Sequence, residues 1–185
     1  MKTFKHIIFC ILLIVPIVSC EKNNPEPQPK EIHLTKKEQL LVESGNTFGL
    51  NLFKKINNNE EDDKNIMISP LSVSIALAMT YNGADSTTKE AMEETLNLVG
   101  LTIDEINNSY KKLINALISV DPKVLLCIAN SIWYRNTFNV EQNFIDLNQN
   151  YYNAEVASLD FSSTEAVDII NNWVADNTND KITEI

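Results

Sequence analysis

Residues 65–96 read NIMISPLSVSIALAMTYNGADSTTKEAMEETL, and this stretch carries most of the information about the fold. Ser69 followed by Pro70 predicts the start of a helix, because serine caps helix N-termini and proline suits the first helical turn. The helix should cover residues 70–82 and stop at the glycine that follows. It has no charged face, so we predict that it is buried on all sides, with Leu77 in the core.

Outward from this helix, the pattern of apolar and polar residues predicts the remaining elements. Threonine or serine followed three residues later by glutamate forms a capping box, which predicts helix starts at Thr87, Thr102 and Ser162. Helical spacing of apolar residues predicts two more helices, over 41–56 and 144–151. Apolar runs predict strands over 66–68, 124–134 and 157–161. Helices come first and strands then alternate with helices, which predicts an α+β fold.

The first residues have the layout of an export signal. Two lysines precede an apolar run over residues 7–18, which is too short to span a bilayer comfortably. The run ends Ile17-Val18-Ser19-Cys20, which resembles the bacterial lipobox, where the cysteine receives the lipid. We predict a signal peptide over residues 1–19 and lipidation of Cys20; the alternative is a plain signal peptide with an incidental cysteine.

A tether over residues 20–33 follows the signal. The sequence EKNNPEPQPK, which begins at Glu21, alternates prolines with polar residues, and this favours an extended chain and excludes a helix. We place the folded domain over residues 34–185. A lipid on Cys20 would hold this domain at the bacterial cell envelope or the cell surface, on the membrane to which the lipid binds.

Composition narrows the classes of function. The formal net charge of −10 at pH 7 disfavours nucleic acid as a partner, because phosphate binding needs clustered lysine and arginine. Catalysis by the domain's one cysteine, Cys127, would need a histidine partner, and the two histidines lie in the leader and near the tether. The apolar run around Cys127 predicts a buried, inert thiol. We predict no catalytic residue, no metal site and no cofactor.

Three stretches together resemble the serpin family. They are residues 65–96, quoted above, residues 129–161, ANSIWYRNTFNVEQNFIDLNQNYYNAEVASLDF, and residues 170–185, INNWVADNTNDKITEI. They occur in family order, and the resemblance covers about residues 40–185. It implies a serpin-like α+β fold that contains the N-terminal helices and the first strands of a large central sheet. It also implies, for a full-length monomer, inhibition of serine or cysteine endopeptidases by cleavage and insertion of a reactive loop.

The resemblance assigns roles to three residues. Ser69 and Ser72 match serines of the family's shutter, a polar cluster beneath the point where the sheet opens. The alternative is that Ser69 only caps the helix and Ser72 only allows close packing. The family usually has glycine at the position of Asp180. Aspartate tolerates positive φ better than most residues, so we expect the same fold there, with a small loss of stability.

The family's reactive loop would follow Ile185, so the reactive-loop bond is not in this sequence. We therefore predict that this chain alone is inactive, and the target protease cannot be read from it. Two other functions stay open: a non-inhibitory serpin-like lipoprotein that binds a partner, and an inert truncated gene product.

Overall fold

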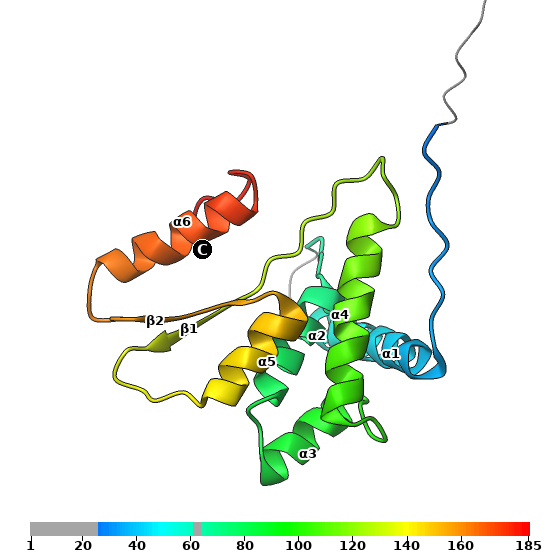
Figure 1. Cartoon of the computed structure of the whole chain (residues 1–185), viewed down its shortest axis with the longest axis horizontal. Helices are drawn as coiled ribbons and strands as arrows, with labels where there is room; N and C mark the ends of the chain where they lie inside the picture. The colour runs from blue at the N-terminus through cyan, green and yellow to red at the C-terminus, as the bar shows by residue number, and fades with distance from the viewer. Residues whose placement is uncertain (1–25, 61–63) are drawn as a thin grey trace, which may run out of the picture.

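The computed structural model describes residues 26–60 and 64–185. The predicted signal peptide and Cys20 lie outside these residues. Along the described chain the elements are α1 (Lys36–Asn59), α2 (Pro70–Tyr81), α3 (Ser86–Thr95), α4 (Ile103–Ser119), β1 (Ser131–Arg135), α5 (Gln142–Tyr152), β2 (Glu155–Leu159) and α6 (Glu165–Asn177) (Figure 1). The predicted α+β class is confirmed. Within the described ranges, no helix is long and apolar enough to cross a bilayer.

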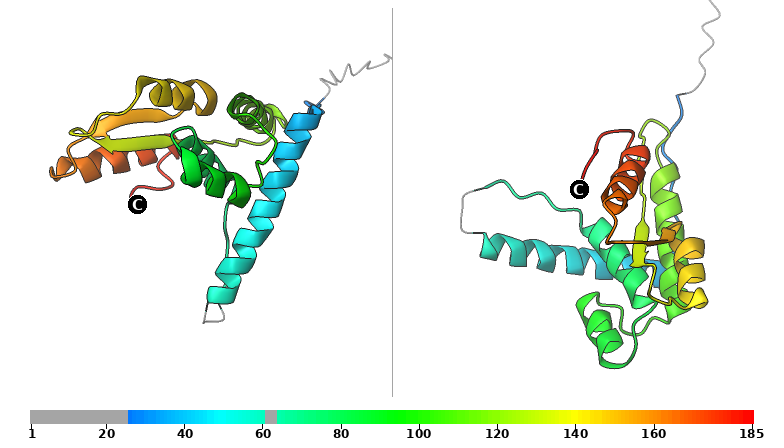
Figure 2. Two further views of the ribbon diagram at one scale, coloured as in Figure 1. Left: turned by 90° about the horizontal axis from the view of Figure 1, so that it is seen from below. Right: turned by 90° about the vertical axis from the view of Figure 1, so that its left-hand side faces the viewer.

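Helices α1, α2, α4 and α5 pack around one apolar core, with α2 in contact with the other three (Figures 1 and 2). Ile75 and Ala78 of α2 and Ile106 of α4 are almost completely removed from solvent. Close approach of α1 to the start of α2 depends on a glycine. A Cβ at Gly49 would lie 2.7 Å from the Cβ of Pro70, which is closer than side-chain atoms pack.

Buried hydrogen bonds tie the C-terminal end of α2 to α4 and α5. The hydroxyl of Tyr152 donates to Asn107 Oδ1 at 2.7 Å, and Asn107 Nδ2 donates to Asn82 Oδ1 at 2.9 Å. The amide of Asn82 in turn donates to Asn148 Oδ1 at 3.4 Å. No buried side-chain polar atom of the described residues lacks a partner. This network therefore fixes the relative positions of three helices without leaving an unpaired polar group.

Strands β1 and β2 form a parallel pair, with Ser131 opposite Glu155 and Arg135 opposite Leu159. Helix α5 provides the crossover that parallel strands need. It covers one face of the pair, and α6 lies across the other (Figure 2). Trp133 of β1 and Trp173 of α6 pack edge to face, with ring centroids 6.0 Å apart, which holds α6 on the sheet.

The prediction that the central helix is buried on all sides is wrong. Helix α2 has the predicted position, but Ser72 and Val73 are exposed and Leu77 is only half-buried. The neighbouring helices cover one side of α2 and leave the side that carries Ser72 open. The apolar sequence of α2 indicated that it needs neighbours, but a composition without charges does not show which faces they cover.

The strand predictions are partly wrong. Within the described residues, the predicted strand over 124–134 is regular only at Ser131–Arg135, and residues 66–68 form no strand. Apolar content favours a strand, but strand geometry also requires a paired neighbour, and β2 pairs only with β1.

One of the three predicted capping boxes is present. Thr102 accepts a hydrogen bond from the backbone N–H of Glu105 at 3.2 Å, and the Glu105 side chain accepts from the Thr102 N–H at 2.9 Å. Thr87 is not a cap, because α3 begins earlier, behind Asp85. Ser162 is not a cap either, because its hydroxyl bonds to the Asp160 carboxylate.

Candidate functional site

The two serines singled out from the sequence lie together at the start of α2. Their hydroxyl oxygens are 2.7 Å apart, and both side chains are exposed. Ser69 occupies the N-cap position but makes no side-chain capping bond, since its hydroxyl bonds to Ser72 instead. Ser69 therefore has the position of a helix cap without the side-chain hydrogen bond of one. The two hydroxyls share one hydrogen bond and make no other with the described residues, so one proton of the pair remains available to a third group.

A cavity of about 480 Å³ lies in front of this serine pair. Its wall is formed by the start of α2, the segment that precedes β1, and the C-terminal part of α6 with the turn that follows. The residues are Ser69, Leu71, Ser72, Ile75, Leu126, Cys127, Ile128, Ala129, Asn130, Trp173, Val174, Asn177, Thr178 and Ile182. None is charged at neutral pH. The cavity thus offers neutral hydroxyl and amide groups on an apolar background.

Cys127 contributes to the wall of this cavity, and the prediction of a buried thiol is wrong. The residue is a free, exposed cysteine. Its apolar neighbours Leu125 and Leu126 are exposed as well, by 83% and 37%. The segment lies on the surface, and its backbone joins no described strand before Ser131. No group that could activate the thiol lines the cavity, so Cys127 adds no chemistry to it.

The turn after α6 closes one end of the cavity. Ile182 donates its backbone N–H to Thr178 Oγ1 at 3.0 Å, and the same hydroxyl donates to the Val174 carbonyl at 2.8 Å. Asp180 has a φ of 57°, as expected for a position where the family usually has glycine. The backbone of Asp180 therefore adopts the left-handed conformation that brings Ile182 back to the cavity wall.

Most of the other cavity amides and hydroxyls already have partners. Asn130 Nδ2 donates to the Tyr152 carbonyl at 3.0 Å, and Asn177 Nδ2 donates to the Trp173 carbonyl at 2.8 Å. The two serine hydroxyls, by contrast, bond only to each other among the described residues. No sequence pattern predicted that α6 and the segment before β1 would meet this pair, because about one hundred residues separate the serines from Thr178.

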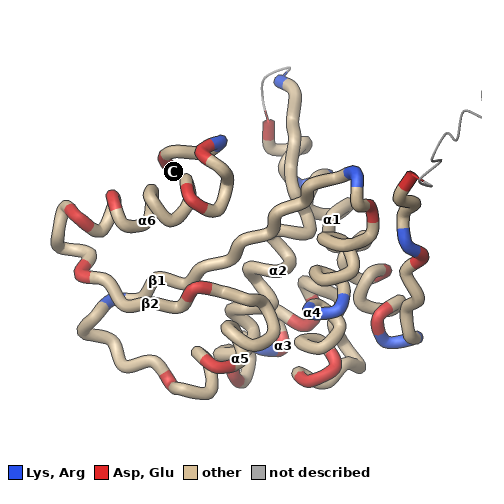
Figure 3. The backbone as a smooth tube through the Cα atoms, turned by 45° about the horizontal axis from the view of Figure 1, so that its top comes forward, with Lys and Arg blue, Asp and Glu red and all other residues tan. Residues whose placement is uncertain are grey.

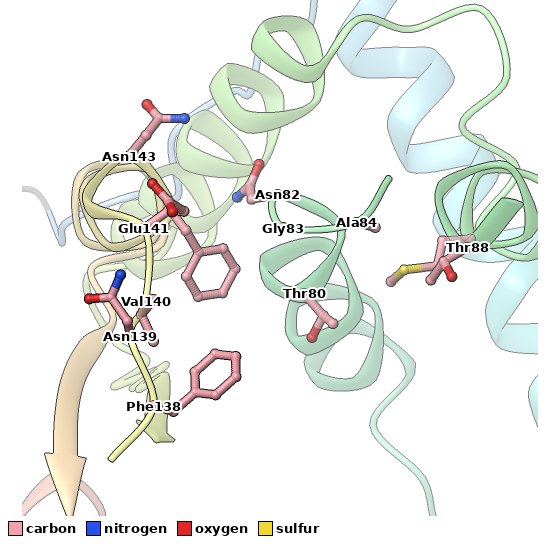
Figure 4. A pocket seen from close by; sticks show the side chains of 12 residues that line it. Thr80, Asn82, Gly83, Ala84, Thr88, Phe138, Asn139, Val140, Glu141 and Asn143 are labelled. Atoms are coloured by element: carbon pink, nitrogen blue, oxygen red, sulfur yellow. The ribbon is translucent and has the colours of Figure 1, made fainter. Parts of the chain in front are cut away.

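A second, larger cavity of about 750 Å³ lies between the end of α2, the start of α3 and the loop before α5 (Figure 4). The ring of Phe138 projects toward Thr80 across this space, and Glu141 is its one charged lining residue. Close packing in the wall requires Gly83, where a Cβ would lie 2.9 Å from the Phe144 ring. Sequence reasoning singled out none of these residues, and their types indicate no reaction chemistry.

The distribution of charged and metal-ligating residues limits the kinds of ligand that the two cavities could bind. Lysine and arginine are scattered over the described surface, with acidic residues spread along α6 (Figure 3). In the same part of the chain, no group of three histidine, cysteine or acidic residues comes together as a metal site would require. The serine cavity has no charged lining residue, and its serine hydroxyls can donate and accept hydrogen bonds. Such groups can bond to the peptide groups of a strand.

Comparison with known proteins identifies the family. A family model described as "Serpin (serine protease inhibitor)" matches residues 43–185. Serpin B6 of Bos taurus is 36% identical over 149 residues, which cover 78% of this chain and 39% of the relative. Neuroserpin of Gallus gallus is 33% identical over 172 residues, 92% of this chain and 38% of the relative.

Comparison with solved structures identifies the same family. The thermophilic serpin tengpin in its latent state superposes with a TM-score of 0.70 at 34% identity, over 84% of this chain and 40% of tengpin. The mouse protein-Z-dependent protease inhibitor superposes with a TM-score of 0.72 at 26% identity. The chain spans about two fifths of the length of the relatives it matches. Its described fold is that part of the serpin fold, and the chain belongs to the serpin family of serine protease inhibitors.

Proposed function

We propose that this chain is the N-terminal part of a lipid-anchored serpin that inhibits serine or cysteine endopeptidases. In such a protein a protease cleaves an exposed loop, and the cleaved loop then inserts as a new strand into the large sheet and releases stored strain. The chain contributes the packed helices, two parallel strands of the sheet and the serine pair. The acyl group on Cys20 holds the inhibitor at the cell envelope, where it protects envelope proteins from proteolysis.

The incomplete hydrogen bonding of the Ser69–Ser72 pair carries the proposal. A sheet that opens and closes must exchange backbone hydrogen bonds without leaving buried peptide groups unpaired. A hydroxyl can donate and accept, and it rotates to suit either arrangement. The pair has one uncommitted proton, faces a neutral cavity and lies at the start of a helix that is fixed by the buried network. These are the properties that a shutter needs.

Residues 21–185 alone should not inhibit a protease. Inhibition needs a bait loop and a sheet that accepts it, and the described residues provide two strands. The open edges of these strands and the exposed segment from Val124 to Leu126 favour association with other chains. We therefore expect this chain on its own to be poorly soluble or to aggregate.

The test begins with the coding DNA beyond codon 185. If the reading frame continues through a serpin reactive loop, the whole product should be purified and incubated with trypsin-like, chymotrypsin-like, elastase-like and papain-like proteases. We expect a covalent complex that survives denaturing electrophoresis with at least one of them. A complete loop without any such complex would favour the non-inhibitory binding lipoprotein. A genuine stop at codon 186 would favour the inert gene product, and a complex formed by residues 21–185 alone would refute the proposal.

The role of the serine pair is tested in the same assay. Ser72→Ala removes one hydroxyl of the pair, and we expect more substrate turnover and less covalent complex, because insertion becomes slower relative to release of the cleaved inhibitor. Ser119→Ala is the matched control, since its hydroxyl bonds only within α4, to the Asn115 and Ala116 carbonyls. Equal complex yields from both variants would contradict a shutter role for Ser72.

The anchor is tested separately. Mass spectrometry of the mature N-terminus should find an acylated cysteine at position 20. We expect Cys20→Ser to release the protein from membranes or to leave its precursor unprocessed. An unmodified N-terminus at another residue would disprove the lipoprotein assignment without affecting the inhibitor assignment.

A further inference from the structure

The Pro-rich tether, which its sequence predicts to be a free spacer, contacts the folded domain. The backbone N–H of Lys30 donates to the Val120 carbonyl at 2.7 Å, directly after α4. The Lys123 ammonium forms an ion pair with the Glu26 carboxylate at 2.5 Å. In Figure 1 the blue tether runs beside α4 and leaves the molecule at the end where α4 stops. Its path is therefore antiparallel to α4 and roughly perpendicular to α1 (Figure 2).

These contacts shorten the free part of the tether. Glu26 lies six positions after Cys20, whereas Thr35, which caps α1, lies fifteen positions after it. An extended chain spans at most about 3.6 Å per residue. The docked tether therefore allows about 20 Å between the acylated cysteine and the domain, and a tether released as far as Thr35 allows about 50 Å.

The docked tether also determines which end of the domain lies closer to the lipid. Helix α4 has 17 residues and so extends about 25 Å from Ile103 to Ser119. The Glu26–Lys123 contact lies past its C-terminal end, so a short anchor places Ser119 closer to the lipid than Asp104. A released tether would leave the domain free to rotate, because its reach exceeds the length of α4.

We propose that the C-terminal end of α4, the turn over residues 121–123 and the docked tether form a surface that faces the lipid bilayer. The partner of this surface is the membrane that carries the acyl chains on Cys20, so the inference rests on the proposed lipid anchor. The docked tether holds the domain close to that membrane and in one orientation. An exposed ion pair shifts such an equilibrium by no more than about fivefold, so the docked state is reversible and weakens as salt concentration rises.

Docking is tested first, without membranes, on the acyl-protein in detergent. Spin labels on Gln28→Cys and Ser119→Cys, in a Cys127→Ser background, report the distance from the tether to the end of α4. We expect a narrow, short distance distribution. Glu26→Lys should raise the undocked fraction roughly two- to fivefold. The exchange Glu26→Lys with Lys123→Glu should restore docking. Glu31→Lys is the matched control, because it makes the same charge change on the tether where the neighbour is only His33, 3.9 Å away.

Orientation is tested next, on the acyl-protein in phosphatidylcholine vesicles that contain an acceptor dye in the headgroup region. Energy transfer from a donor on Ser119→Cys should exceed that from a donor on Asp104→Cys. The difference should shrink in the Glu26→Lys background and return in the double exchange. Equal transfer from both positions, or equal effects of Glu26→Lys and Glu31→Lys, would overturn the proposal. If Cys20 carries no acyl group and the protein does not bind vesicles, both the anchor and this membrane surface fail, while the detergent distances still report whether the tether docks.

Discussion

The helical part of the molecule and the part around the sheet differ in how completely they bury their apolar residues. In the helical part, Ile75, Ile106 and Tyr152 are at most 1% exposed, and every buried side-chain polar atom described has a partner. Around the sheet, Leu125 is 83% exposed and Val167 of α6 is 59% exposed. The helices therefore enclose a buried core, although α1 also keeps some apolar side chains exposed, whereas the sheet and α6 present apolar surface that the described residues do not cover.

This difference predicts where substitutions matter most. Ile75→Ala leaves a cavity in the helical core, and we expect it to lower the free energy of unfolding by about 2–5 kcal/mol. Val73→Ala, on the open side of the same helix, should change it by less than about 1 kcal/mol, and the half-buried Leu77 should lie between them. Urea unfolding of residues 21–185 at low protein concentration measures all three. Similar losses for Ile75→Ala and Val73→Ala would show that the helical part has no core of its own.

The buried polar network provides the next test of the comparison. Tyr152→Phe removes the donor to Asn107 Oδ1 and leaves that oxygen buried without its partner. We expect a loss of about 1–3 kcal/mol in the free energy of unfolding. Tyr151→Phe is the matched control, because this neighbouring hydroxyl is outside the network, and its change should be within about 0.5 kcal/mol. If the two variants lose the same amount, the network does not hold the helices together.

Alkaline pH tests the same residue. Burial raises the pKa of Tyr152, because the charged phenolate is disfavoured in the core. A tyrosine in the unfolded chain ionises near pH 10. Below about pH 10 the free energy of unfolding is therefore unaffected by this group, and it falls as pH rises further, because only the unfolded state then loses the proton. Burial also raises the pKa of Tyr110, so this residue contributes in the same direction. We expect the alkaline loss of stability to be shallower in Tyr152→Phe than in the unchanged protein.

Substitutions at helix starts should change the free energy of unfolding by a smaller amount, and by different amounts in the helical part and in the part around the sheet. Thr102→Ala removes the functioning capping box of α4, and we expect a loss of about 1 kcal/mol. Ser162→Ala, near the start of α6, removes a hydroxyl that bonds to Asp160 and caps no helix, so its effect should stay within about 0.5 kcal/mol. Thermal unfolding followed by circular dichroism measures both. A larger loss for Ser162→Ala would mean that the start of α6 depends on the turn over residues 160–163.

These cases show what could be predicted from the sequence. Local signals were sufficient to predict helices at α2, α4, α5 and α6, because these signals depend on neighbours in sequence, although the capping box predicted for α6 is absent. Burial of Cys127 and Leu77 was predicted wrongly, because burial depends on which segments pack against a residue. The two serines were selected through a family resemblance, and their role as a shutter stays a prediction. Their meeting with α6 depends on contacts across about one hundred residues. Tether docking was missed because a single backbone hydrogen bond and an ion pair leave no sequence pattern.

The smallest expected effect concerns the turn that closes the serine cavity. Asp180 has a φ of 57°, and its N–H donates to the Ala175 carbonyl at 2.9 Å, so the left-handed conformation is part of how α6 ends. Glycine adopts this conformation without the crowding of Cβ, which costs other residues about 1–2 kcal/mol and aspartate somewhat less. Glycine also makes the unfolded chain more flexible, which offsets about 0.4–1 kcal/mol. We therefore expect Asp180→Gly to stabilise the protein by about 0.5 kcal/mol.

The control for this prediction makes the same chemical change in a helical conformation. Asp176→Gly, within α6, should destabilise by about 0.5 kcal/mol, because glycine is the poorer helix former. Asp180→Val should destabilise by about 1–2 kcal/mol, because a β-branched side chain tolerates positive φ poorly. Opposite signs for the two glycine variants, measured by urea unfolding, would establish that the backbone conformation at Asp180 sets its stability. A loss in Asp180→Gly would instead mean that the aspartate side chain stabilises the turn, and that this departure from the family's glycine benefits the fold.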